Sequence, residues 1–132
     1  MNIIGRLASA ISYPQGVPAD VVDFAFKVDD GEVHAFDLEK RLVLAREISR
    51  EEDELPRIAS YSAGRMFRED AALYWDERRG AAMLAQEISA TAAPHEMKVF
   101  FETFADSCDW WLARMEAEPM KTASFPEMVI RP

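Results

Sequence analysis

The feature that most constrains the fold is a stripe of large apolar side chains late in the chain. Its members alternate at spacings of four and three residues: Met97, Phe101, Phe104, Cys108, Trp111 and Met115. This spacing places them on one side of an α-helix, and Pro94 suits the first turn. Burying each aromatic side chain contributes roughly 1.5–3 kcal/mol. The sequence therefore predicts a long helix from about residue 94, packed firmly on another layer.

Two tryptophans in this helix are expected to have different environments. Trp111 belongs to the apolar stripe, whereas Trp110 lies about 100° away around the helix axis. We expect Trp111 in the core and Trp110 at its flank.

A β-hairpin is expected directly before the helix. Apolar segments at 71–75 and 81–88 flank a polar turn at 76–80 that ends in Gly80. Residues 116–132 lose the helical pattern. We therefore expect one domain over residues 1–118 and a C-terminal tail over residues 119–132.

The first half of the chain predicts a short helix and a three-stranded antiparallel meander. Residues 2–12 carry apolar groups on one helical face, and the segment 13–18, with two prolines, breaks that helix. The helix is either packed on the core or a movable arm that lines a groove. Alternation over 22–28 indicates a strand, and segments 33–38 and 41–48 follow after short turns.

A second helix is expected after the meander. Ser49 and Glu52 have the spacing of a capping box, so the helix should begin near Ser49. Ala59, Ser62 and Ala63 give it a face of small residues. That face is either ordinary packing on the sheet or a dimer contact, and we slightly favour the dimer contact.

The expected fold is therefore α+β. Its elements are a helix, a three-stranded antiparallel meander, a helix, a β-hairpin and a long C-terminal helix. A single antiparallel sheet packs on the helices, and the protein is a homodimer.

Composition excludes several classes of function. The 132-residue chain is 49% hydrophobic and carries a formal net charge of −9, which disfavours nucleic acid and anionic membranes as partners. Cys108 is the single cysteine, so no internal disulfide forms. No segment has the apolar length of a signal peptide or membrane span. A soluble protein in the bacterial cytoplasm is expected.

The residues give no positive reason for catalysis. His34 and His95 have no partner at a metal-ligand spacing, and no phosphate loop or nucleophile motif occurs. Carboxylates cluster in turns at 29–32 and 76–77, where solvated charge is the ordinary explanation. We expect no catalytic residue, metal or cofactor. A small metal-dependent hydrolase using Asp29, Asp30 and Asp76 remains the enzymatic alternative.

The order of the elements, in a small acidic chain, resembles the class I chaperones of bacterial type III secretion (the CesT/Tir chaperone family). Four segments carry the resemblance: 26–31 leading into Val33, 73–77 with Gly80 and 84–88, 101–104 leading to Trp110-Trp111, and 128–131. The second helix, rich in alanine and serine, departs from the family pattern at the expected dimer contact.

The resemblance implies a homodimeric secretion chaperone. Such a protein binds the N-terminal segment of a type III effector in extended form and keeps it soluble and secretion-competent. Short effector strands pair with the sheet edge, and their apolar side chains enter surface grooves. Two alternatives are a regulatory partner-switch protein of the same secretion system and a self-contained structural α+β dimer.

Two sets of residues are expected to carry these contacts. The effector groove is assigned to the first helix and the first three strands: Ile4, Leu7, Ile11, Phe24, Phe26, Phe36, Leu42 and Leu44. The dimer interface is assigned to the second helix and the hairpin: Ile58, Tyr61, Ser62, Leu73, Tyr74 and Trp75.

Overall fold

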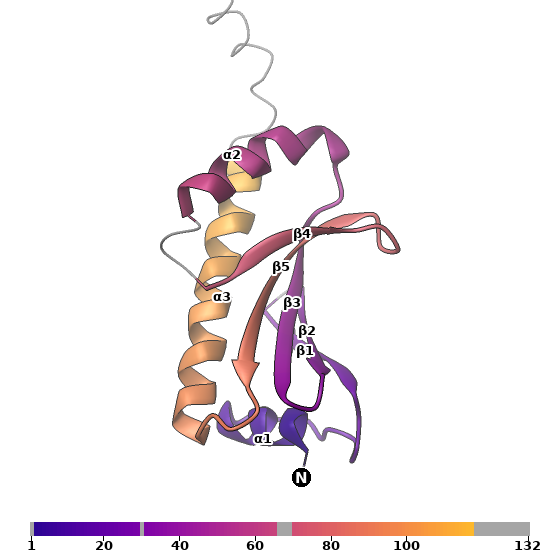
Figure 1. The fold of residues 1–132 in the computed structure, drawn as a ribbon, viewed down its shortest axis with the longest axis vertical. Helices are drawn as coiled ribbons and strands as arrows, with labels where there is room; N and C mark the ends of the chain where they lie inside the picture. Colours follow the sequence, from indigo (N-terminus) through magenta and orange to yellow (C-terminus); the bar gives the residue numbers. More distant parts are fainter. Residues whose placement is uncertain (1, 30, 66–69, 118–132) are drawn as a thin grey trace, which may run out of the picture.

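The computed structural model describes residues 2–29, 31–65 and 70–117, within which three α-helices and five strands form one α+β domain (Figure 1). The elements follow in the order α1 (Ile3–Ala10), β1 (Asp23–Val28), β2 (Gly31–Asp37), β3 (Arg41–Ser49), α2 (Leu55–Arg65), β4 (Ala72–Asp76), β5 (Ala81–Ser89) and α3 (Pro94–Ala117). Figure 1 shows α3 running along the sheet, with α1 near one end and α2 near the other. The expected α+β fold class is confirmed, whereas the homodimer stays a prediction. The whole of the expected tail, residues 119–132, lies outside the described residues, and the segment 128–131 lies outside them with it.

All five strands form one antiparallel sheet in the order β1-β2-β3-β5-β4. The meander of β1, β2 and β3 is joined to the β4–β5 hairpin by pairing of β3 with β5, from Arg41 opposite Ser89 to Ser49 opposite Ala82. This pairing is irregular between Glu47 and Ser49. Strands β1 and β4 therefore form the two edges of the sheet.

The turn between β4 and β5 is built by its first and last residues. The Asp76 carboxylate accepts hydrogen bonds from the backbone N–H groups of Arg78 and Arg79, at 3.0 and 3.2 Å. Gly80 has a φ of +63°, a conformation that costs glycine little. The hairpin expected from the sequence is confirmed, with its turn at the expected place.

The apolar stripe of α3 faces the sheet as predicted. Its first five members are buried, and Met115 is half-buried: the buried residues are Met97, Phe101, Phe104, Cys108 and Trp111. They pack with the apolar side of β1, β2, β3 and β5 in one core. Trp111 is 1% exposed, whereas Trp110 is half-buried and stacks edge-on against it at 5.1 Å. The expected orientation of both tryptophans is confirmed.

Helix α1 belongs to the same core. Ile3, Ile4 and Leu7 are buried on its inner face. The side chain of Asn2 caps the helix by accepting a hydrogen bond from Gly5 N–H at 2.9 Å. Arg6 donates to the carbonyl of Ala90, which joins α1 to the segment before α3. Of the two interpretations of this helix, the structure supports packing on the core.

The expected start of the second helix is wrong. Ser49 is the last residue of β3, and its hydroxyl accepts a hydrogen bond from Glu51 N–H at 3.1 Å. A 3-10 turn over Glu52–Glu54 follows, and α2 begins only at Leu55. Pairing with β5 extends β3 through Ser49, and the 3-10 turn separates this residue from the start of α2. The capping-box motif of Ser49 and Glu52 therefore does not mark the start of α2.

The two tryptophans of α3 give a direct test of this packing. Trp111→Ala is expected to lower the free energy of unfolding by roughly 3–5 kcal/mol, because it empties a fully buried site. Trp110→Ala should cost less, about 1 kcal/mol, because the ring is partly solvated. Urea denaturation of the two single variants measures both losses. Equal losses would contradict this orientation of α3.

Candidate functional site

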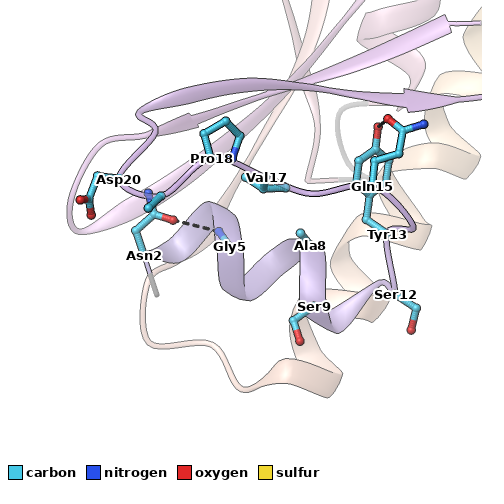
Figure 2. Close-up of a pocket in the computed structure, with 11 residues that line it drawn as sticks. Asn2, Gly5, Ala8, Ser9, Ser12, Tyr13, Gln15, Val17, Pro18 and Asp20 are labelled. Atoms are coloured by element: carbon cyan, nitrogen blue, oxygen red, sulfur yellow. Dashed lines mark hydrogen bonds between the residues drawn. The ribbon is translucent and has the colours of Figure 1, made fainter.

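A groove of about 540 Å³ lies between α1 and the segment that follows it. Small and polar residues line most of it, joined by a few larger side chains: Asn2, Gly5, Ala8, Ser9, Ser12, Tyr13, Gln15, Val17, Pro18, Ala19 and Asp20. Figure 2 shows Tyr13 and Gln15 at one end of the groove and Asn2 and Asp20 at the other. The groove is therefore formed by a continuous stretch of the chain, from the start of α1 to the approach to β1.

Two hydrogen bonds, one donated by Asn2 and one accepted by Tyr13, fix the two ends of this groove. Asn2 Nδ2 donates to the carbonyl of Val21 at 2.6 Å, so the residue that caps α1 also fixes the approach to β1. At the other end the Tyr13 hydroxyl accepts a hydrogen bond from Lys27 N–H in β1, at 3.1 Å. The groove therefore adjoins the edge strand β1. Tyr13 lines the groove and also contacts the backbone of β1.

Most of the residues expected to line an effector groove are in the core. Five of the eight are fully buried: Ile4, Leu7, Phe26, Leu42 and Leu44. They lie in one core formed by α1, α3 and the sheet of the same chain, so they are not available to a partner in this structure. The structure thus corrects their assignment to a groove surface. A regular spacing of apolar residues identifies which side of a helix or strand is covered. It does not show whether the same chain or a partner covers that side.

The other three expected groove residues are half-buried and do not form one surface. Ile11 and Phe24 pack against the main core. Phe36 lies on the opposite face of the sheet, against a small cluster of Ala45, Ala81 and Met83. Their contact with an effector stays a prediction.

Tyr13 and Val17 were not identified from the sequence as groove residues. They lie in the proline-rich break after α1, where no regular spacing of apolar residues indicates a surface.

The expected dimer residues occupy a separate surface over α2 and β4. Ile58 is 3% exposed and is covered within the monomer. Tyr74 is 44% exposed on β4, and the remaining four are half-buried: Tyr61, Ser62, Leu73 and Trp75. The small residues Ala59 and Ala63 of α2 are exposed, as a close approach by another chain would require.

Aromatic rings and guanidinium groups lie beside this surface. The Arg65 guanidinium stacks over the Trp110 ring at 3.8 Å, and that of Arg114 lies 4.8 Å from the same ring and 5.4 Å from Tyr61. Tyr61 also meets Trp110 edge-on at 6.0 Å. Tryptophan, tyrosine and arginine are the residues most enriched at energetically important interface positions.

Charged side chains surround a hollow of about 370 Å³ on the side of the sheet away from the main core. Arg79 Nη1 lies 3.5 Å from His34 Nε2 and also pairs with the Asp76 carboxylate at 3.5 Å.

Burial lowers the pKa of His34, and the positive charge of Arg79 lowers it further. Burial likewise raises the pKa of Tyr74, with a further contribution from Asp76. No cluster of three or more metal-binding side chains occurs among the described residues.

No protein-family model matches this chain, and no curated protein sequence matches it. Solved structures do match. The HopA1–SchA chaperone–effector complex aligns at a TM-score of 0.67 and 13% identity, over 83% of this chain and 90% of the other. The ExsC–ExsE complex aligns at 0.64 and 19% identity, over 83% and 88%. YbjN from E. coli, described as a candidate transcription regulator, aligns at 0.67 and 10% identity, over 87% and 90%.

These comparisons establish the fold. The resemblance to type III secretion chaperones that the sequence indicated is confirmed in the arrangement of helices and strands. None of the helices within the described ranges combines the length and apolar character that a membrane span requires.

The lowered pKa of His34 predicts how the free energy of unfolding depends on pH. Its pKa in the folded protein is lowered, so the unfolded chain takes up a proton first as the pH falls below about 6.5. The free energy of unfolding should therefore fall between about pH 7.5 and about pH 5.5. His34→Gln should flatten this part of the curve in urea denaturation measured across that range. An unchanged slope in the variant would show that other groups control it.

Proposed function

We propose that this protein is a secretion chaperone that binds the N-terminal segment of a type III effector and keeps it soluble and secretion-competent. One observation carries the proposal. The fold aligns over more than four-fifths of the chain with SchA, solved in a chaperone–effector complex, and with ExsC, solved in complex with ExsE. The effector is a protein segment in extended form, and no cofactor takes part.

The surface of the protein supports this proposal. The groove beside α1 adjoins the edge strand β1, so an extended segment finds a hollow for side chains next to free backbone groups. Strand addition at a sheet edge uses both features. The net charge of −9 favours solubility of a complex whose client exposes apolar side chains.

The proposal includes a homodimer formed through α2 and β4. Strand β4 pairs only with β5 among the described strands, and Tyr74 is exposed on it. Exposed Ala59 and Ala63 permit a close approach to α2. This surface lies over different elements from the groove beside α1, so the two kinds of contact do not compete for the same residues.

The contacts of Asp76 oppose the alternative of a metal-dependent hydrolase that uses Asp29, Asp30 and Asp76. Asp76 is used by the turn and by the Arg79 pair. Asp29 has a φ of +48° in the β1–β2 turn, and Asp30 lies outside the described residues. A regulatory partner-switch protein of the same secretion system remains the second candidate, and the fold match with YbjN, described as a candidate transcription regulator, is compatible with a regulatory role.

Co-expression with the product of the neighbouring gene tests the chaperone function. The N-terminal segment of that product should co-purify with this chain and should remain bound in EDTA. Ala8→Glu, which places a charge in the groove, is expected to weaken retention roughly tenfold, equivalent to about 1.4 kcal/mol. Val99→Glu, at an exposed position of α3, is the matched control. Equal retention by the two variants would remove the groove from the proposal, and no retention by the natural chain would oppose the function.

Light scattering tests the dimer. The natural chain should show about twice the mass of one chain at micromolar concentration. Tyr74→Asp is expected to give a monomer with only a modest loss of melting temperature, because the side chain is 44% exposed on an edge strand and is outside the main core. Val99→Asp should remain dimeric. A natural chain that is monomeric would refute this part of the proposal.

A further inference from the structure

Two hydrogen bonds establish which backbone groups of the edge strand β1 point towards β2 and which point away from the sheet. The carbonyl of Val22 accepts a hydrogen bond from Asp37 N–H at 2.8 Å, so the backbone of Val22 points towards β2. Lys27 N–H instead donates away from β2, to the Tyr13 hydroxyl. Because these directions alternate along an antiparallel edge strand, the backbone groups of Asp23, Ala25 and Lys27 all point outward.

Tyr13 already occupies one of these three outward positions. Its hydroxyl accepts from Lys27 N–H at 3.1 Å and lies 3.5 Å from Gln15 Oε1, to which it can donate. The outward N–H and C=O of Ala25 have no backbone partner among the described residues. The free edge of β1 is therefore divided into an occupied end at Lys27 and an open stretch at Asp23 and Ala25.

Three contacts fix Tyr13 in this place. The end of α1 positions it: Ser12 has a φ of +56°, and Tyr13 N–H donates to the carbonyl of Ala8 at 2.9 Å, as in a Schellman motif. Its ring packs edge-on against Phe26 at 4.9 Å and Phe24 at 6.0 Å. Moving the ring would remove cover from Phe26, which is fully buried.

We propose that Tyr13 sets the register of strand addition on β1. An extended polypeptide segment of the client pairs with Asp23 and Ala25 and stops before Lys27, where the tyrosine hydroxyl holds the edge. This inference rests on the proposed function for its client. The hydrogen bond between Tyr13 and Lys27 is a property of the free protein and can be tested without one.

The side chains beside β1 define the chemistry of the segment. A residue added opposite Phe24 lies on the helix-bearing side of the sheet, next to a half-buried aromatic ring and the groove that contains Tyr13 and Val17. An apolar side chain fits there. Residues opposite Asp23 and Ala25 face the other side of the sheet, at an outer edge where Asp23 is exposed, so a polar side chain there stays solvated. The client segment therefore alternates apolar and polar residues.

Amide hydrogen exchange in the free protein tests the cap. Lys27 N–H should exchange more slowly than Ala25 N–H, because only the first has an acceptor. Tyr13→Phe keeps the ring and removes the hydroxyl, so exchange at Lys27 should become roughly three- to tenfold faster while Ala25 is unchanged. Equal exchange at the two amides in the natural chain would overturn the assignment of Tyr13.

The complex with the N-terminal segment of the neighbouring gene product tests the register. On binding, Ala25 N–H should become protected, whereas Lys27 N–H should change little. Ala25→Pro removes the outward donor at an edge position where proline is tolerated, and it should weaken binding at least about fivefold. Ala25→Thr keeps the donor and is the matched control. The exchange measurement on the natural chain serves if Ala25→Pro does not fold.

Each contrary result has a distinct meaning. A complex that forms with no change at Ala25 overturns the register while leaving the chaperone function intact. If Ala25→Pro dissociates a dimer without affecting the client, the edge of β1 serves a second copy of this chain, and the inference is wrong. If the natural chain retains no segment, the proposed function fails together with strand addition, and exchange at Lys27 still decides whether Tyr13 caps the strand.

Discussion

The pairing of β5 with β3 is the constraint on which the rest of the structure depends. It joins two parts of the chain that are separated by α2, and it places β4 outside β5 instead of beside the meander. Because α3 follows β5 directly, this pairing also decides where the apolar stripe of α3 meets the sheet. The two remaining free edges, β1 and β4, are consequences of the same arrangement.

The elements were predictable from the sequence because their apolar periods are strong. The stripe from Met97 to Trp111 indicated both the existence of α3 and its buried side, and Gly80 indicated the hairpin turn. The strand order was not predictable, since alternation identifies a strand without naming its neighbour. Ser49 shows the same limit locally: its capping motif is real in the sequence, but pairing with β5 uses the residue in β3.

Prediction of the candidate surfaces was weaker, and for a physical reason. Leu7 and Phe26 were assigned to a groove because they are apolar and regularly spaced, yet the chain itself covers them. A surface that binds a partner need not have any period. Tyr13 lies in a segment that was noted only for breaking a helix, and its proposed role depends on a hydrogen bond from Lys27, fourteen residues away. Only the folded structure brings that pair together.

The β1 edge meets two opposing requirements on a protein that would bind extended segments. A free edge attracts other strands without selection, which makes it an aggregation hazard, but a fully covered edge cannot bind a client. In this protein a tyrosine hydroxyl occupies one end of β1 and leaves a short open stretch at Ala25. A short stretch supplies few hydrogen bonds, so binding by backbone pairing alone is weak. Under the proposed strand addition, a client would also need side chains that fit the adjacent groove, and this requirement would give the edge its selectivity.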